Sequence, residues 1–206
     1  MFDLLECFHE LENLGSSPLA ATRLDSVAHY LSSHPIKFDS VRRYLHERCD
    51  ADRDSVLLAS VETSTHVKWS LFGQRHDGVR IWLHDYGKWS EADSRFANSI
   101  HDHRYGFVSV ILAGGYTEHR WSMNVELLEK RDSRKYTAGD ILMIDSMTIH
   151  SLEAVQRATA TLVVQLPKDK DYSNIYDRRS DGTFTERRQY DLAHKFSRVG
   201  DERDSR

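Results

Sequence analysis

Short runs of β-branched and aromatic residues, separated by turn signals, fill the chain from residue 55 to residue 166. Such runs are typical of strands, and Asp77-Gly78 and Asp181-Gly182 are hairpin signals. Many short strands with few helices among them predict an antiparallel sandwich or barrel. The expected strands are residues 56–59, 67–72, 79–84, 100–112, 116–123, 125–128, 141–144, 150–155 and 159–166.

The first 50 residues have a different pattern, in which apolar residues recur at the three-to-four spacing of amphipathic helices. Gly15 ends the first run, Ser17-Pro18 has the form of an N-cap and first helical position, and Asp39 or Ser40 can cap a third helix. We therefore expect a helical segment over residues 1–54, a barrel over residues 55–190 and a polar, flexible tail over residues 191–206.

Composition limits the classes of function. The chain of 206 residues carries a formal net charge of −4, and the basic pairs Arg178-Arg179 and Arg187-Arg188 are interleaved with acids, which argues against a nucleic-acid partner. No apolar run reaches the length of a membrane span. Cys7 and Cys49 form no Cys-x-x-Cys motif, and residues 1–20 lack the features of a signal peptide. We expect a cytoplasmic protein without disulfides or membrane contact.

The motif that bears most directly on function is His101-Asp102-His103. Side chains alternate along a strand, so both imidazoles would lie on one face, and His150 follows on a later strand-like run. Three neutral imidazoles can bind a divalent transition metal and leave coordination positions open. The chain has 12 histidines, so a surface His-x-His with an unrelated third histidine is the alternative.

The residues after the motif can be assigned to two faces if the strand continues unbroken. Tyr105, Phe107, Ser109 and Ile111 would then point inward with the histidines, giving the site an apolar and aromatic wall. The opposite face becomes apolar at Val108, Val110 and Leu112. We therefore expect this strand to be covered on both faces.

Several of these elements together resemble the two motifs of the cupin superfamily: His101-x-His103, the Gly114-Gly115 turn, and Gly139 followed by His150. The string Ile100-His101-Asp102-His103 resembles the cysteine dioxygenase-like branch of that superfamily. The resemblance implies a mainly β, antiparallel double-stranded β-helix (a cupin or jelly-roll barrel) preceded by helices. It also implies a mononuclear iron(II) held by His101, His103 and His150.

The chain departs from these families in ways that bear on the site. Many cupins carry a glutamate four or five residues after the second histidine, where this chain has Phe107 and Val108, so a three-histidine site is favoured. The Ser-x-His-x-Tyr strand of cysteine dioxygenases corresponds here to residues 161–165, which lack the histidine and the tyrosine. Lys68, with Arg80 or Arg75 as alternatives, takes the place of an arginine that binds a carboxylate. L-cysteine is therefore a doubtful substrate.

We expect a non-heme iron(II) dioxygenase that acts on a small anionic molecule, such as a thiol, together with dioxygen. Tyr105 and His119 are the candidate proton or hydrogen-bond donors, and His119 or Glu118 could also join the metal shell. The candidate substrate-binding residues are Lys68, Arg80 and Tyr116. The tyrosines could equally be core aromatics, and Lys68 and Arg80 could be solvated strand residues.

Two other classes of function stay open. The ligand set does not choose the metal, so Zn, Ni or Mn could serve an isomerase, lyase or hydrolase on the same barrel. The protein could also be a non-enzymatic cupin that binds a small molecule. The sequence leaves the substrate undetermined and is compatible with a monomer or a homodimer.

Overall fold

The computed structural model describes residues 3–17, 20–63, 65–73, 78–87, 99–125 and 127–190. In this part of the chain, three helices precede a set of antiparallel strands. The helices are α1 (Leu4–Gly15), α2 (Ala20–Ser33) and α3 (Phe38–Ala59). The strands are β1 (Val61–Glu62), β2 (Val67–Phe72), β3 (Arg80–Asp85), β4 (Ile100–His101), β5 (Tyr105–Ala113), β6 (Gly115–Asn124), β7 (Leu127–Thr137), β8 (Ile141–Ile144), β9 (Ile149–Glu153), β10 (Ala160–Lys168), β11 (Tyr172–Arg178) and β12 (Phe184–Tyr190).

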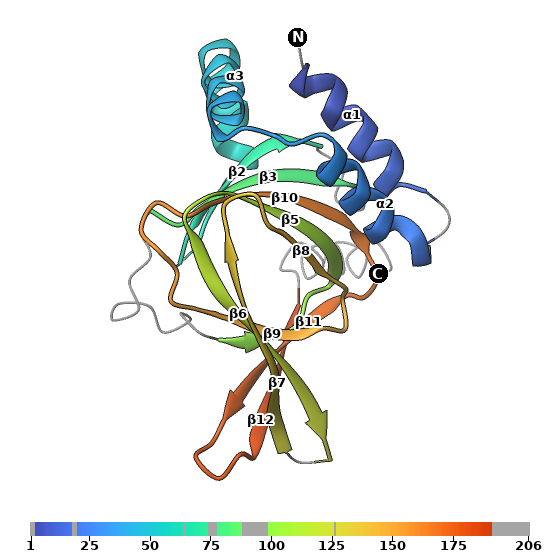
Figure 1. Cartoon of the computed structure of the whole chain (residues 1–206), viewed down its shortest axis with the longest axis vertical. Helices are drawn as coiled ribbons and strands as arrows, with labels where there is room; N and C mark the ends of the chain where they lie inside the picture. Colours follow the sequence, from blue (N-terminus) through green and yellow to red (C-terminus); the bar gives the residue numbers. More distant parts are fainter. Residues whose placement is uncertain are drawn as a thin grey trace, which may run out of the picture.

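The strands form two six-stranded sheets. Sheet A has the order β1-β2-β3-β10-β5-β8, and sheet B has the order β12-β11-β4-β9-β6-β7. From β4 onward the chain changes sheet at almost every connection, which is the winding of a double-stranded β-helix. The predicted fold class is confirmed. Figure 1 shows the helices over one side of the barrel and the β7 and β12 ends projecting at the other.

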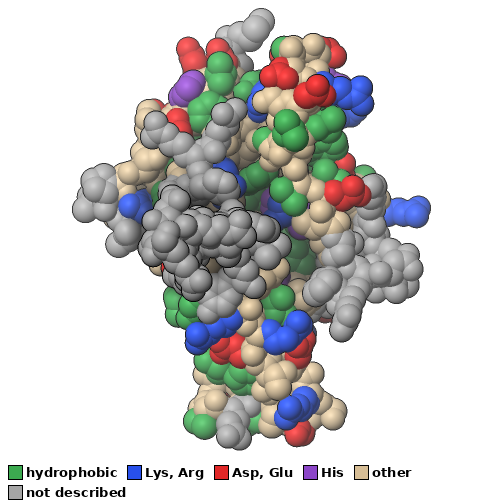
Figure 2. Space-filling view, turned by 180° about the vertical axis from the view of Figure 1, so that it is seen from behind, with side chains coloured by type: hydrophobic (Ala, Val, Ile, Leu, Met, Phe, Trp, Pro, Cys, Tyr) green, Lys and Arg blue, Asp and Glu red, His purple; other side chains and the backbone are tan. Residues whose placement is uncertain are grey.

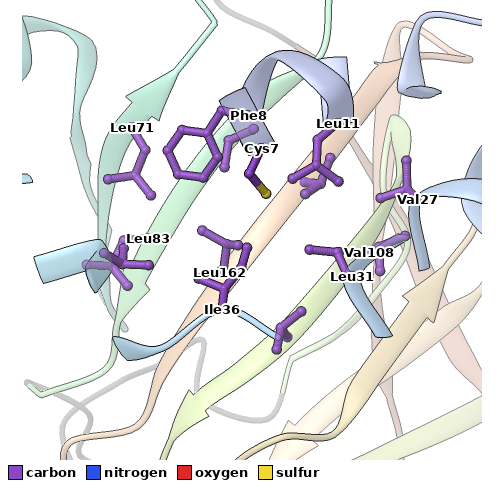
Figure 3. Close-up of a cluster of buried hydrophobic side chains, with 14 of the residues drawn as sticks. Cys7, Phe8, Leu11, Val27, Leu31, Ile36, Leu71, Leu83, Val108 and Leu162 are labelled. Atoms are coloured by element: carbon purple, nitrogen blue, oxygen red, sulfur yellow. The ribbon is translucent and has the colours of Figure 1, made fainter. Parts of the chain in front are cut away.

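The three helices cover the outer face of sheet A. Phe8 and Leu11 from α1 and Val27 from α2 belong to the same buried cluster as Val108 and Leu162 of the sheet (Figure 3). The inward-facing side of β5 contributes to a second cluster inside the barrel. The expectation that β5 is covered on both faces is therefore confirmed, because the helices supply its outer cover.

The expected strand over residues 56–59 is wrong. Residues 56–59 form the last turn of α3, in which Val56 is 1% exposed and Leu58 is 87% exposed. Asp52 has non-helical backbone angles, and its carboxylate accepts a hydrogen bond from the backbone N–H of Ser55. This contact caps a new helical turn after a kink, so the helix continues through an apolar run too short to be classified by its periodicity.

Other expectations concern the surface and the ends of the chain. Cys7 and Cys49 are free thiols. Among the described residues, no helix combines the length and apolar character needed to cross a membrane. Figure 2 shows basic and acidic side chains close together on the projecting hairpins. The expected tail at residues 191–206, Pro18 and Asp77 lie outside the described residues.

Candidate metal centre

His101, His103 and His150 come together in the barrel. Their candidate ligand nitrogens all lie within 4.8 Å of one another, and Nε2 of His103 is 2.8 Å from Nε2 of His150. Among the residues that the structure describes, no other group of three or more His, Cys, Asp or Glu side chains meets this criterion. The predicted trio is therefore a spatial cluster, and a surface His-x-His is excluded.

Two different backbone features place these imidazoles. His101 on β4 and His150 on β9 are directly opposite each other in sheet B, so their side chains share one face. His103 lies in the segment 102–104, where the chain leaves sheet B and enters β5 of sheet A. The expected unbroken strand over residues 100–112 is therefore wrong, although the inward face of β5 was assigned correctly.

Asp102 holds the crossing segment in place. It is 3% exposed, and its carboxylate accepts hydrogen bonds from the backbone N–H (2.7 Å) and Nδ2 (3.0 Å) of Asn174 and from the Tyr176 hydroxyl (3.2 Å). The Lys170 ammonium lies 2.9 Å from the same carboxylate. These partners direct the Asp102 side chain toward β11 and fix the backbone between the two histidines.

Each histidine of sheet B has a partner behind it. Nδ1 of His101 lies 2.9 Å from the Ser99 carbonyl oxygen, a contact that assigns the proton to Nδ1 and leaves Nε2 as the lone-pair donor. Nδ1 of His150 lies 3.7 Å from a carboxylate oxygen of Glu118. A carboxylate behind a ligating imidazole orients the ring and increases its basicity.

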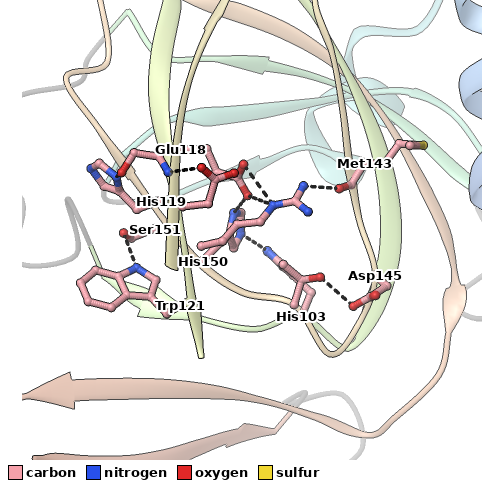
Figure 4. Close-up of polar contacts among 12 residues, drawn as sticks. His103, Glu118, His119, Trp121, Met143, Asp145, His150 and Ser151 are labelled. Carbon is pink, nitrogen blue, oxygen red and sulfur yellow. Dashed lines mark hydrogen bonds and ion pairs between the residues drawn. The ribbon is translucent and has the colours of Figure 1, made fainter. Parts of the chain in front are cut away.

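Glu118 is itself buried and is held by Arg120. It is 1% exposed and lies 3.2 Å from Nε of Arg120, whose guanidinium also donates to the Met143 carbonyl oxygen (Figure 4). Glu118 is thus behind His150 and outside the three-histidine cluster. The expectation that Glu118 could supply a metal ligand is replaced by a supporting role.

Burial keeps the imidazoles of His101 and His103 neutral. It lowers the pKa of His101 to about 4, with a further contribution from nearby His150. The pKa of His103 is lowered well below its ordinary value, first by burial and then by His101, His150 and the Lys68 ammonium. Neutral imidazole is the form that binds metals, so these residues need to lose no proton on binding at neutral pH.

The cluster fits a divalent transition metal. The Nε2 atoms of His103 and His150 face each other at a distance at which only one of them can donate, and Nδ1 of His150 has no hydrogen-bond partner among the described residues. A cation would accept the lone pairs of facing nitrogens, and Nδ1–H of His150 would then point to Glu118.

The histidines line a cavity of about 630 Å³ between the two sheets. Of the predicted site residues, Lys68, Tyr105 and Tyr116 also line it. Aromatic side chains form much of its wall, and the ring of Phe107 lies 4.9 Å from that of His103. The volume suits a small molecule.

Two predicted residues do not line this cavity. His119 lies between Glu118 and Arg120, so alternation turns it to the outer face of sheet B, where it contacts Ser133 (2.7 Å) and Glu153. Arg80 stacks over Trp82 with 5.5 Å between its guanidinium carbon and the ring centre. Neither residue is placed to act on a molecule bound at the histidines.

Two histidines missed by the sequence analysis do line the cavity. His84 on β3 pairs in register with Lys68 on β2, and His66 lies two residues before Lys68. Alternation from Lys68 is the signal that could have identified them, because residues paired across strands or two apart share a face.

The comparisons with known proteins place the chain beside cupin-domain structures. No family model and no curated protein matches the sequence. A cupin-2 domain protein from Rhodospirillum rubrum is similar at 16% identity (TM-score 0.37), over 53% of this chain and 68% of that chain. A cupin 2 conserved barrel protein from Rhodopseudomonas palustris is similar at 12% identity (TM-score 0.38), over 59% of this chain and 74% of that chain.

An iron protein is also among the similar structures. It is HEPD from Streptomyces albus with its substrate 2-hydroxyethylphosphonate and Fe(II) bound, at 14% identity and a TM-score of 0.37. The match covers 51% of this chain and 22% of the HEPD chain. This likeness does not extend to the whole of either protein.

We predict that His101→Ala, His103→Ala and His150→Ala each remove most of the bound metal, because two imidazoles hold a cation far more weakly than three. His119→Ala is the matched control and keeps its metal, since His119 lies on the outer face of sheet B. Elemental analysis of the purified variants measures the metal content. Full occupancy in all three cavity variants would refute the site.

We predict that Glu118→Gln weakens metal affinity by about 10- to 100-fold, the usual effect of removing a carboxylate behind a ligating histidine. Glu153→Gln, which changes a carboxylate on the outer face of sheet B, leaves affinity unchanged. Competition with a chromophoric chelator gives both constants. Equal affinities in the two variants would contradict the supporting role of Glu118.

His66 contributes to the pH dependence of stability. Burial first, then Lys68 and His101, lowers the pKa of His66 from 6.5 to about 3. Between these two pKa values the unfolded chain binds a proton on His66 that the folded chain does not bind. The contribution of His66 to the free energy of unfolding therefore falls as the pH drops from 6.5 toward 3 and is constant above 6.5.

Urea denaturation of the chelator-treated protein at several pH values measures this dependence. We expect the fall to be shallower in His66→Gln than in the wild type, while His29→Gln on helix α2 behaves as the wild type. Parallel curves for His66→Gln and the wild type would show that His66 titrates normally in the folded protein.

Proposed function

We propose that the protein is an iron(II)-dependent oxygenase of cysteine dioxygenase-like type, which acts on a small anionic molecule in the barrel cavity. The observation that carries the proposal is the cluster of three imidazoles on the wall of the cavity, of which His101 and His103 have lowered pKa values. Bound iron(II) supplies Lewis acidity and one-electron chemistry with dioxygen. The remaining steps depend on what this chain's own residues do.

The charge of the cavity favours an anion. Lys68 contributes an ammonium group, and an imidazole ligand brings no negative charge, so a divalent cation held by the three histidines would keep its full charge. Among the described lining residues, Asp102 is the one carboxylate, and its charge is already paired with Lys170. A thiolate, enolate or carboxylate would therefore meet positive charge on two sides.

Tyrosine hydroxyls can orient such a substrate. Burial raises the pKa of Tyr116 well above its ordinary value, so its phenol stays protonated and can donate a hydrogen bond. Tyr105 lines the same cavity, with its ring 5.8 Å from that of His103. We propose that Tyr116 positions substrate and that Tyr105 provides a proton or hydrogen bond at the reacting end.

The side chains of β10 that line the cavity argue against L-cysteine as the substrate. Thr161, Val163 and Gln165 of β10 line the cavity where cysteine dioxygenases carry their serine, histidine and tyrosine. Val163 offers no polar atom, and Oε1 of Gln165 accepts a hydrogen bond from Nε1 of Trp82 at 3.1 Å. This wall is less polar than the one the resemblance implies, and it suits a different thiol or another small anion.

The experiment is oxygen uptake by protein reconstituted anaerobically with iron(II) and screened with small thiols and 1,3-dicarbonyls. We expect substrate-dependent oxygen consumption that His103→Ala abolishes, and little turnover of L-cysteine. The zinc-loaded protein is the control for metal without redox chemistry. Conversion without oxygen uptake, by the zinc form as well, would replace the proposal with Lewis-acid catalysis.

A further inference from the structure

The outer face of sheet B carries a serine, a histidine and a glutamate in one hydrogen-bonded row. Ser133 on β7 is directly opposite His119 on β6, and Nδ1 of His119 lies 2.7 Å from the Ser133 hydroxyl oxygen. On the other side of the ring, Glu153 of β9 contacts Nε2 of His119. The strands β9, β6 and β7 are neighbours in the sheet. A serine, a histidine and a carboxylate joined in this order are the parts of a hydrolytic triad.

The carboxylate of Glu153 determines which ring nitrogen carries the proton. An ionised carboxylate can only accept a hydrogen bond, so Nε2 of a neutral His119 ring carries the proton and donates it to Glu153. This hydrogen bond is the main reason why the pKa of Glu153 is lower than its ordinary value. Nδ1 is then unprotonated, and its contact with Ser133 is a hydrogen bond donated by the serine hydroxyl. The serine proton therefore points at a base.

Exposure along the row suits a nucleophile in front of an oriented base. Ser133 is exposed, whereas the His119 side chain is 9% exposed. Glu153 is the last residue of β9, and Ala154 after it has a φ of 52°, in the left-handed region that alanine rarely adopts. Such strain persists only where the surrounding structure fixes the backbone. The strand end that presents the carboxylate is thus held in one conformation.

Positive charge lies beside the serine. Lys135 is two residues after Ser133 on β7, so alternation places both side chains on the same face. Lys130 is close enough to Glu153 to interact with it electrostatically. The backbone N–H of Ser133 donates to the Asp132 carboxylate at 2.8 Å and is therefore engaged. The lysine ammonium groups are thus the groups that can stabilise the negative charge formed at an attacked ester carbonyl.

We propose that Ser133, His119 and Glu153 form a second active site, which hydrolyses short carboxylic esters. The Ser133 hydroxyl oxygen bonds to the ester carbonyl carbon while its proton passes to Nδ1 of His119. The bond from that carbon to the alcohol oxygen breaks, and the proton goes to the leaving alkoxide. Water then gives a proton to His119, attacks acyl-Ser133 and releases the acid, and the proton returns to the serine oxygen. Glu153 is a positioning residue that holds the ring.

This site is separate from the metal centre. Its three residues do not line the cavity, which lies on the opposite face of sheet B. The reaction consumes one ester and one water and needs no metal and no oxidant. We therefore expect ester hydrolysis to persist in the chelator-treated protein and in His103→Ala. The inference does not depend on the oxygenase proposal.

The first test is covalent labelling of the chelator-treated, full-length protein with a fluorophosphonate, which reacts with activated serine hydroxyls. Peptide mass spectrometry locates the label, and its time course gives the rate. We expect the label at Ser133 and a rate about tenfold or more lower in His119→Ala. Ser122→Ala is the matched control, because it removes a β6 hydroxyl that accepts a hydrogen bond from Arg131. A fluorophosphonate that leaves Ser133 unlabelled, or labels it equally fast without His119, would overturn the site.

The second test measures hydrolysis of 4-nitrophenyl acetate by the same proteins. We expect Ser133→Ala to lower kcat/KM about tenfold or more, and Ser133→Ala/His119→Ala to be no slower than either single variant, because a triad acts as a unit. Ser133 is exposed, so its loss leaves the fold intact and tests the nucleophile alone. A wild-type rate in Ser133→Ala would assign any hydrolysis to other surface groups and refute the proposal.

The third test concerns the positioning role of Glu153. Nitrogen-15 chemical shifts of the His119 ring, assigned by comparison with His119→Ala, show which nitrogen carries the proton. We expect the proton on Nε2 in the wild type and a mixture of tautomers in Glu153→Gln, together with slower labelling of Ser133. A wild-type ring protonated on Nδ1 could not accept the serine proton and would contradict the mechanism.

Discussion

The buried carboxylate of Asp102 is the contact on which the site depends. Between His101 and His103 the chain must leave one sheet for the other, and the backbone N–H of Asp102 donates to the Asn174 carbonyl oxygen at 3.1 Å. The Asp102 side chain adds further contacts by accepting hydrogen bonds from Asn174 and Tyr176 of β11 and pairing with Lys170. A buried carboxylate is tolerated only when it is paired and hydrogen-bonded in this way. The contacts that compensate for its burial therefore also position the two imidazoles.

The same burial sets the chemistry of the cavity. Desolvation disfavours the charged forms of His66, His101 and His103, and the Lys68 ammonium acts in the same direction. The protein thus concentrates nitrogen donors in one place, and among the described residues no carboxylate belongs to the three-histidine cluster. In such an environment a bound cation keeps its positive charge, so the cavity favours a negatively charged substrate whatever its shape.

Much of this arrangement could be predicted from the sequence, because the signals were local. The alternation along residues 105–112 correctly gave both faces of β5, and the helix spacing correctly placed three helices before the barrel. The crossing between the sheets at residues 102–104 could not be predicted from the local sequence, since it depends on Asn174, which is 72 positions from Asp102. His119 was expected at the site, whereas alternation along β6 places it on the outer face of sheet B. Residues 56–59 were assigned to a strand because the capping contact of Asp52 was overlooked.

The position of His103 outside both sheets has a consequence for the barrel as a whole. His101 and His150 belong to adjacent strands, so a ligand shared by these two alone would only reinforce a pairing that already exists. A ligand shared with His103 also ties the passage between the sheets to β9. Anything that binds all three nitrogens in the folded chain alone raises the stability of that chain by mass action. Metal binding at the three histidines and the stability of the contact between residues 102–104 and β9 are therefore thermodynamically linked. We expect the metal-free protein to unfold locally at this contact first.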